Sequence, residues 1–237
     1  MQKLKNILVT GGCGFIGSNF VRYLYKKYPG YRIYVLDALT YAGNLENLED
    51  IEAVELNVPE VESRYVLVKG DISDEELLET LFEKHTFTYV FNFAAESHVD
   101  RSFFNFSNFV RTNVEGALIL ARMVARFGGL MVHVSTDEVY GSIPEHLGFV
   151  KEDAPFWPAN PYASSKAAAD MLLQSMMKTS KTPVRIIRST NNFGPYQYPE
   201  KLIPLGITNL LEGKKIPLHG SGEHLRQWIY VEDVCEA

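Results

Sequence analysis

Short apolar runs alternate with amphipathic stretches along most of the 237-residue chain. The apolar runs that we expect to form strands are 6–10, 32–36, 65–69, 88–93, 131–134 and 183–188. Apolar residues at helical spacing predict helices directly after residue 17 and at 74–84, 105–127 and 162–177. Strands that alternate with helices in this way are typical of the α/β class, and they predict a doubly wound parallel sheet.

Two stretches depart from this alternation. Residues 50–63 are acidic and irregular, and we interpret them as a surface loop that follows a turn at 41–47. From Asn191 onward the pattern changes to turns and short elements, and an apolar, strand-like run follows at 228–231. We therefore predict one large domain over 1–190 and the beginning of a smaller substrate-binding lobe over 191–237. The short second part favours the interpretation that the sequence is a fragment.

Composition and charge narrow the classes of protein that remain. The chain is 46% hydrophobic and 22% charged, as in ordinary globular proteins, and its net charge of −6 argues against nucleic acid as the main partner. It contains no apolar stretch of the roughly 20 residues that a membrane span requires, and its first residues do not resemble a signal peptide. Cys13 and Cys235 lack metal-ligand spacing. We expect a cytoplasmic protein with free thiols, no metal and no membrane partner.

A glycine-rich turn joins the first strand to the first helix. Gly11 to Gly17 has the glycine spacing of dinucleotide-binding turns, in which the backbone approaches a pyrophosphate at a helix N-terminus. The second strand ends in Asp37, at the spacing expected of an acid that binds a ribose. No arginine follows at 38–40, so NAD is favoured over NADP. The small residues of 94–97 would let a flat cofactor lie against the backbone.

Polar residues follow the apolar run at 131–134 without a break. Ser135 and Thr136 precede the adjacent carboxylates Asp137 and Glu138. Ligands of parallel α/β sheets bind beyond the carboxyl ends of strands, where such residues are suited to acid–base chemistry. The alternative is an N-cap for the next helix, a position that Ser, Thr and Asp often occupy. The run alone does not separate these two interpretations.

Tyr162 and Lys166 are four residues apart and share one face of a predicted helix. A neighbouring ammonium favours the phenolate of a tyrosine and makes it a usable base. Tyr23 and Lys27 repeat this spacing in the first helix, where we expect two surface residues. Tyr162 differs because it begins the helix that comes after the strand carrying Thr136 to Glu138, so these elements are expected to converge on one substrate.

These motifs resemble the extended short-chain dehydrogenase/reductase superfamily, whose fold is Rossmann-like. Within it, four stretches resemble the nucleoside-diphosphate-glucose 4,6-dehydratases: Leu39 to Asn44, Ala94 to Ser102, Ser135 to Gly141 and Pro199 to Leu205. The resemblance runs from Asn6 to Ala237 in one register. The Asp-Glu pair after Thr136 is its most specific feature, because related epimerases and decarboxylases usually lack it.

The resemblance implies a lyase that holds NAD tightly and makes a 4-keto-6-deoxy sugar nucleotide, with dTDP-glucose favoured over UDP-glucose. It implies that Tyr162 removes the 4-hydroxyl proton while NAD takes hydride from C4, assisted by Thr136 and Lys166. Glu138 would then remove the C5 proton, and Asp137 would protonate the departing C6 hydroxyl before hydride returns to C6. One carboxylate must begin protonated, which the neighbouring like charge promotes.

The resemblance also implies sets of binding residues and a homodimer formed through a four-helix interface. The implied cofactor contacts are Gly11, Gly14, Phe15, Ile16, Gly17, Asp37, Leu39, Thr40, Asp71, Ile72, Phe93, Ala94, Ala95, Ser97, Thr112, Tyr162, Lys166 and Asn192. The implied sugar-nucleotide contacts are Ser97, Thr136, Asn191, Lys201, Leu202, Pro217, His219 and Arg226.

Some residues and functions have competing interpretations. We expect Cys13 to be a packing residue, and the strand-borne His98 and His133 to be structural residues and not ligands or bases. Asn191, Lys201 and Arg226 are as easily a turn former and solvated charges as substrate contacts. Two other functions stay open: a sugar-nucleotide 4-epimerase or decarboxylase, and a non-catalytic NAD-binding regulatory protein.

Overall fold

A computed structural model describes residues 4–144, 148–218 and 220–237 of the chain. Six parallel strands form its main sheet in the order β3-β2-β1-β4-β5-β6. The bounds of these strands are β1 Lys5–Thr10, β2 Tyr31–Asp37, β3 Tyr65–Lys69, β4 Phe87–Asn92, β5 Leu130–Thr136 and β6 Val184–Ser189. The expected doubly wound α/β fold is confirmed, and each expected strand is present to within a few residues.

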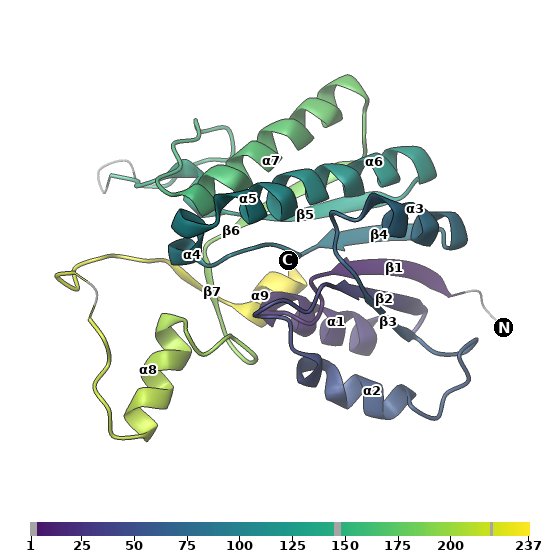
Figure 1. The fold of residues 1–237 in the computed structure, drawn as a ribbon, viewed down its shortest axis with the longest axis horizontal. Coiled ribbons are helices and arrows are strands. Elements are labelled where there is room, and N and C mark those ends of the chain that lie inside the picture. Colours follow the sequence, from purple (N-terminus) through teal and green to yellow (C-terminus); the bar gives the residue numbers. More distant parts are fainter. Residues whose placement is uncertain (1–3, 145–147, 219) are drawn as a thin grey trace.

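The central strands are buried on both faces because helices cover the sheet from two sides (Figure 1). Leu8 and Leu36 point to one core, which is completed by apolar residues of α3 (Glu75–Lys84), α6 (Ala117–Phe127) and α7 (Pro161–Thr179). Their neighbours in sequence, Val9 and Val35, point to the other core, against α1 (Phe15–Lys27) and α2 (Glu49–Glu55). Two-sided burial is the reason that these strands appear as continuous apolar runs.

The strand order places a crevice above β1 and β4. The chain leaves β1 toward β2 and β3 on one side, and then crosses to β4, β5 and β6 on the other. Ligands of such sheets bind at this reversal, beyond the carboxyl ends of the strands. The first turn is tight: a Cβ at Gly17 would lie only 2.1 Å from the backbone oxygen of Gly11, so α1 can begin there only with glycine.

The acidic stretch after β2 is partly helical, so its assignment to a loop over 50–63 was wrong. The short turn η1 (Leu45–Leu48) runs directly into α2, and the chain is irregular only from residue 56 to 64. Leu48 and Ile51 are buried against α1, while acids occupy the first turn of α2, where the helix dipole favours them. Two buried apolar residues in an acidic segment were too weak a sequence signal.

The long helix expected at 105–127 is a succession of different helical turns. It consists of α5 (Phe106–Phe109), a π-helical segment η2 (Val110–Gly116) and α6. A separate helix, α4 (Val99–Phe104), precedes it and was not expected. His98 caps α4 by accepting from the backbone N–H of Arg101, so the expectation that His98 lies on a strand was wrong.

The last part of the chain forms a small second sheet and returns to the first core. β7 (Asn191–Phe193) pairs in parallel with β8 (Trp228–Tyr230), which confirms the strand-like run expected at 228–231 except for its last residue. Between them, α8 (Leu202–Leu211) was not expected. The final helix, α9 (Val231–Glu236), lies against α1, with Val231 and Cys235 buried (Figure 1). The division into two domains at residue 190 stays a prediction.

None of the helices in the described ranges combines the length and the apolar character needed to cross a bilayer.

Candidate functional site

A cleft of about 660 Å³ lies at the carboxyl ends of all six strands of the main sheet. Its wall includes the loop after each strand, namely 11–17, 36–43, 70–72, 93–99, 134–138 and 189–192. Residues 197–202, Arg226 and Trp228 close it from the second sheet. The volume falls in the range of roughly 300–1,000 Å³ that is typical of small-molecule sites.

One end of the cleft has the features of a dinucleotide site. Gly14 caps α1 with extended backbone and no side-chain acceptor, and the first turn of α1 contains no acidic residue. The N-terminal N–H groups of this helix are thus available to an anion. Asp37 lies on the same wall and is only 8% exposed. Its two oxygens accept from the backbone N–H groups of Cys13 at 2.9 Å and Leu39 at 2.8 Å, which fix its orientation.

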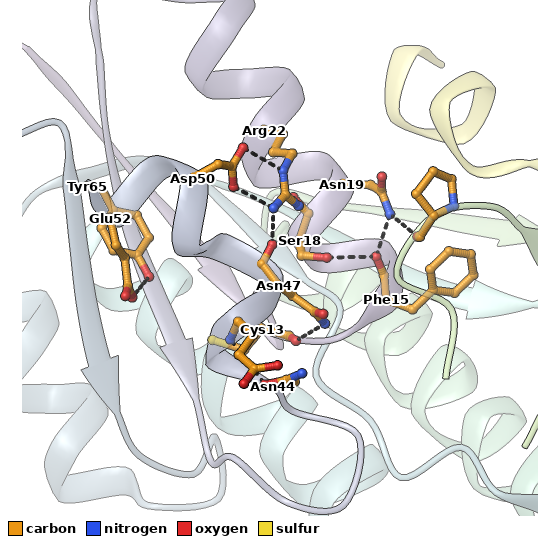
Figure 2. A network of polar contacts seen from close by, with 12 residues as sticks. Cys13, Phe15, Ser18, Asn19, Arg22, Asn44, Asn47, Asp50, Glu52 and Tyr65 are labelled. Carbon is orange, nitrogen blue, oxygen red and sulfur yellow. Dashed lines mark hydrogen bonds and ion pairs between the residues drawn. The ribbon is translucent and has the colours of Figure 1, made fainter. Parts of the chain in front are cut away.

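A polar network on the far side of α1 holds the glycine turn in place (Figure 2). The Asn47 amide donates to the backbone oxygen of Cys13 at 2.9 Å, and Arg22 donates to the Asn47 backbone oxygen and to Asp50. Cys13 is fully buried, and burial raises the pKa of its thiol to about 12. Cys13 is therefore a packing residue, as expected. The hydrogen bonds made by residues of η1 and α2 hold the glycine turn in place.

The other end of the cleft carries the polar residues that follow β5. Thr136 is 8% exposed, and its hydroxyl accepts from the backbone N–H of Glu138 at 3.2 Å. This makes Thr136 the N-cap of a single 3₁₀ turn, η3 (Asp137–Tyr140). The capping interpretation is therefore correct for Thr136, yet Thr136, Asp137 and Glu138 also line the cleft. Capping is what orients this run toward the cleft.

The two carboxylates have different surroundings. Burial, reinforced by the adjacent charge of Glu138, raises the pKa of Asp137 above its ordinary value. Glu138 accepts a hydrogen bond from the side-chain amide of Asn160 at 3.0 Å. The oxygen of the same amide accepts from the N–H of Ala163 and caps α7. Asn160 thus links Glu138 to the helix that carries Tyr162 and Lys166.

Tyr162 and Lys166 occupy the first turns of α7 and both line the cleft. Burial, and next the charge of Glu138, raise the pKa of Tyr162, while the Thr136 hydroxyl opposes this shift. Lys166 is 2% exposed, and its ammonium donates to the backbone oxygen of Val134 at 2.8 Å. Burial lowers the pKa of Lys166 to about 8. The structure therefore brings Thr136, Asp137, Glu138, Tyr162 and Lys166 together, although they come from two separate segments.

Most of the expected binding residues also line the cleft. Of the expected cofactor contacts, only Leu39 does not, because its side chain packs against the core beside α1. Of the expected sugar-nucleotide contacts, Ser97, Thr136, Asn191, Lys201, Leu202 and Arg226 line the cleft. Pro217 does not line it, and His219 lies outside the described residues.

Several polar residues of the site were missed in the sequence. Asn160 had a recognisable signal, because an Asn directly before a Pro that starts an apolar helix is a typical N-cap. Asn113 had none: it lies in the π-helical segment η2 and donates to the backbone of Glu96 and to the Ser165 hydroxyl, both at 2.9 Å. Glu200 and Tyr198 line the cleft, and Glu200 lies 3.1 Å from His98. Only the folded chain brings these segments together.

The residues present fit NAD. The N-terminus of α1 and the glycine turn suit a pyrophosphate, and a carboxylate fixed by two N–H groups suits a pair of ribose hydroxyls. Asp37 is followed on the wall by Ala38 and Thr40, so a 2′-phosphate would meet the Asp37 carboxylate.

Comparisons with known proteins agree with this site. The model of the GDP-mannose 4,6 dehydratase family matches residues 8–237. A dTDP-glucose 4,6-dehydratase of Streptomyces niveus is 46% identical over 236 residues, which are 98% of this chain and 67% of that protein. The crystal structure of dTDP-glucose 4,6-dehydratase from Bacillus anthracis in complex with NAD is similar with a TM-score of 0.87 at 47% identity. That match covers 98% of this chain and 69% of the other.

A more distant likeness has a different activity. UDP-glucose 4-epimerase from Thermotoga maritima, solved with UDP-glucose, is similar with a TM-score of 0.85 at 30% identity, over 98% of this chain and 71% of the other. The chain spans about two thirds of the length of the curated dehydratases that it matches. The family model covers all but the first residues, and these dehydratases are more similar to this chain than that epimerase is. The chain belongs to the GDP-mannose 4,6 dehydratase family.

Proposed function

We propose that this chain carries the cofactor-binding and catalytic site of a dTDP-glucose 4,6-dehydratase that uses NAD and yields dTDP-4-keto-6-deoxyglucose. The observation that supports it most is the pair Asp137 and Glu138 on the same cleft wall as Tyr162 and Lys166. An elimination needs an acid and a base at neighbouring carbons, and this wall offers both beside a tyrosine–lysine pair.

NAD, bound between the glycine turn and Asp37, supplies reversible hydride acceptance from the sugar C4 and donation to C6. This chain's own residues supply the remaining steps. Gly14, Ile16 and Asp37 would hold the pyrophosphate and the ribose, and the loop at 93–97 would offer a flat wall to the cofactor. Tyr162 and Lys166 adjoin this wall, which brings them within reach of both cofactor and sugar.

Tyr162 removes the proton from the sugar 4-hydroxyl. Its pKa is raised, chiefly by burial, so it needs positive charge nearby to work as a base. The Lys166 ammonium and the oxidised cofactor both favour the phenolate. The Thr136 hydroxyl, which lowers the pKa of Tyr162, assists by sharing the proton of the 4-hydroxyl group.

Glu138 and Asp137 divide the elimination between them. A ketone at C4 makes the C5 proton acidic, and Glu138, held by Asn160, is the base that removes it. Asp137 keeps its proton more readily because burial and the adjacent carboxylate raise its pKa, so it protonates the departing C6 hydroxyl. The two carboxylates therefore lie in different surroundings, which supports a division of roles between them.

Asn191, Lys201, Leu202 and Arg226 bind the sugar or the diphosphate in this proposal. Their place on the cleft wall and the two positive charges support it. The domain boundary at residue 190 and the contacts from Pro217 and His219 stay predictions. UDP-glucose stays the alternative substrate.

We further propose a homodimer formed through α4, α5 and α7. Large apolar side chains are exposed on these packed helices, among them Phe103 at 62%, Phe104 at 91% and Met171 at 61%. A second copy that covers them with the same face would complete a bundle of helices around the interface. The cytoplasmic location expected from the sequence stays a prediction.

The main competing function is a sugar-nucleotide 4-epimerase, and the epimerase likeness gives it a definite basis. An epimerase oxidises and reduces C4 alone, so it needs no acid and base at C5 and C6. Asp137 and Glu138 therefore favour the dehydratase. A non-catalytic NAD-binding protein has no use for the complete set of Thr136, Tyr162 and Lys166.

Mass spectrometry, combined with chromatography that resolves sugar epimers, separates these functions. The purified protein is incubated with NAD and either dTDP-glucose or UDP-glucose. We expect a product of dTDP-glucose that has lost one water, and little reaction of UDP-glucose. A product of unchanged mass that is a 4-epimer would instead support the epimerase, and unreacted substrate with tight NAD binding would support the regulatory protein.

A further inference from the structure

Buried polar side chains lie beside Lys166, between β5 and α7. His133 is 0% exposed, and its Nε2 lies 3.3 Å from Nζ of Lys166. The same Nε2 lies 4.0 Å from Oδ1 of Asp170, which is also 0% exposed and one turn beyond Lys166 on α7. The mechanism above uses neither His133 nor Asp170, although buried polar groups of this kind are costly unless they are partnered.

The neighbours of His133 define which of its nitrogens carries the proton. The Thr10 hydroxyl donates to Oδ1 of Asn92 at 2.6 Å, so the amide nitrogen of Asn92 faces the other way. That nitrogen lies 3.0 Å from Nδ1 of His133, and an amide nitrogen can only donate. Nδ1 is therefore the acceptor. Burial, and next the Lys166 charge, hold the pKa of His133 well below 6.5, so the ring is neutral and its proton is on Nε2.

Asp170 is held from the other side. Nε of Arg188 donates to its Oδ2 at 2.7 Å, and Arg188 also donates to the Tyr140 hydroxyl. Burial raises the pKa of Asp170, and the ion pair with Arg188 opposes that shift. Its other oxygen, Oδ1, is buried and accepts no hydrogen bond from the residues that the structure describes. Oδ1 of Asp170 is thus the carboxylate oxygen that faces His133, and the charge of Asp170 acts on Lys166.

We propose that His133 and Asp170 are positioning residues that set the charge of Lys166 from opposite directions. The Asp170 carboxylate stabilises the ammonium of Lys166 by its negative charge. The N–H at Nε2 of His133 stabilises the free amine, because only an uncharged nitrogen has a lone pair to accept it. Burial lowers the pKa of Lys166 to about 8 and the Asp170 charge opposes that shift, so both neighbours act on a group that titrates near neutral pH.

Other ionisable groups near Lys166 act on the cleft side or through Asp170. Tyr162 on α7 and Asp137 and Glu138 on η3 face the cleft. On the core side, Arg188 of β6 is paired with Asp170 and donates to Tyr140 of η3. Asp170 is the ionised residue that chiefly raises the pKa of Lys166, in opposition to burial. The proposal extends the dehydratase function above by identifying what prepares Lys166 to stabilise the Tyr162 phenolate.

The test is a direct titration of Lys166, followed by nuclear magnetic resonance of lysine labelled with carbon-13 at Cε. The Lys166 signal is assigned by its loss in Lys166→Arg. In Asp170→Asn we expect the Lys166 pKa to fall by roughly 1–3 units, the usual effect of removing a nearby opposite charge. In His133→Leu we expect it to rise by roughly half a unit to one unit, the worth of one net hydrogen bond.

Two further variants make the result specific. His133→Gln retains an N–H near the position of Nε2 and should keep the parent pKa of Lys166. Asp50→Asn removes a carboxylate that also pairs with an arginine, Arg22, but lies on α2 (Figure 2), and should leave Lys166 unchanged. Circular dichroism checks that each variant is folded. If Asp170→Asn does not fold, the difference between His133→Leu and His133→Gln decides alone.

Shifts in opposite directions for Asp170→Asn and His133→Leu, with Gln restoring the parent value, would support the proposal. An unmoved Lys166 pKa in either variant, or a fall in both, would overturn it and leave the two residues as core packing. The titration needs neither substrate nor cofactor. A failure here is therefore distinct from a failure of dehydratase activity, which the mass of the product reports.

Discussion

Two tyrosine–lysine pairs with identical spacing lie in opposite surroundings in this molecule. Tyr23 and Lys27 lie near the C-terminal end of α1, where the ammonium donates to the phenolic oxygen and the lysine side chain is 46% exposed. This contact with Tyr23 raises the pKa of Lys27. Tyr162 and Lys166 begin α7, where burial lowers the pKa of Lys166 to about 8. The same motif therefore gives an ordinary surface lysine in one place and a strongly perturbed one in the other.

The difference comes from what faces each helix and not from the helix itself. The end of α1 that carries Lys27 is partly exposed and meets only an exposed carboxylate there, Glu236 of α9 at 3.7 Å, whereas the first turns of α7 face the carboxyl end of β5 and its acids. The Val134 backbone oxygen fixes Lys166 in the wall of the cleft. A spacing of four residues guarantees only that two side chains share a face. A catalytic site also requires a second structural element that places reactive groups against that face.

The largest expected effect is the removal of one phenolic hydroxyl. We expect Tyr162→Phe to slow oxidation at C4 by about 10⁴-fold, the upper range for loss of a general base, and to lose every later step. Tyr23→Phe is the matched control and should keep the parent rate. Absorbance of the reduced cofactor in a single turnover measures both. Equal rates in the two variants would remove the distinction between the pairs.

The next effect concerns the acid that accompanies only the buried pair. Asp137→Asn should retain binding and C4 oxidation but slow elimination by roughly 10²–10⁴-fold, because an amide is too weak an acid to protonate a leaving hydroxyl. A 6-fluoro sugar leaves without that proton and should be much less affected. The measurement is the ratio of variant to parent rates on the two substrates. Equal slowing of both would mean that Asp137 only positions the sugar.

A smaller effect is expected at the cofactor, which adjoins Tyr162 and is remote from Lys27. Asp37→Ala removes the acceptor for the ribose hydroxyls and should weaken NAD binding by roughly 1–3 kcal/mol, the cost of leaving buried hydrogen-bonding groups unpaired. Titration calorimetry measures this loss. The parent should also bind NAD much more tightly than NADP, and equal dissociation constants for the two would contradict the role of Asp37.

Sequence patterns were sufficient where local periodicity and the sheet agree. The six strands and the residues at their carboxyl ends could be predicted because a parallel sheet collects strand ends at one edge. Sequence patterns were not sufficient where a few contacts between residues distant in sequence determine the structure. The acidic stretch forms a helix because Ile51 is buried against α1. The helix α9 is likewise stabilised by Val231 and Cys235, which are buried in the same core. No local sequence pattern predicts such contacts.

The same limit applies to the site. Tyr162 and Lys166 could be identified from their neighbours in sequence, whereas Asn160, Asn113 and Glu200 matter through partners in other segments. His133 was correctly expected to be buried on a strand, but its partners Asn92 and Asp170 lie 41 and 37 positions away. Polar contacts at such separations become visible only when the fold has brought the elements together.

The smallest expected effect is a pH dependence of stability that distinguishes the two lysines. The pKa of Lys166 is about 8 when folded and 10.5 as a free side chain, so between these values the unfolded chain binds more protons. The contribution of Lys166 to the free energy of unfolding must therefore rise with pH from 8 to 10.5, by roughly 1–3 kcal/mol. Urea denaturation of parent and Lys166→Met at several pH values measures the difference. Lys27→Met should track the parent, and a falling difference for Lys166→Met would contradict the lowered pKa.

Whether the polar strand end and the tyrosine–lysine pair form one dehydratase site is tested most directly with Glu138→Gln in deuterated water. The variant retains Tyr162 and Lys166 but lacks the base for C5. With dTDP-glucose we expect it to reduce the bound cofactor in the first turnover, while C5 exchanges no proton with solvent and no water is lost from the sugar. The parent should exchange that proton and release the dehydrated product. Exchange at C5 at the parent rate in Glu138→Gln would contradict the account, because the acids after β5 would then take no part in the elimination.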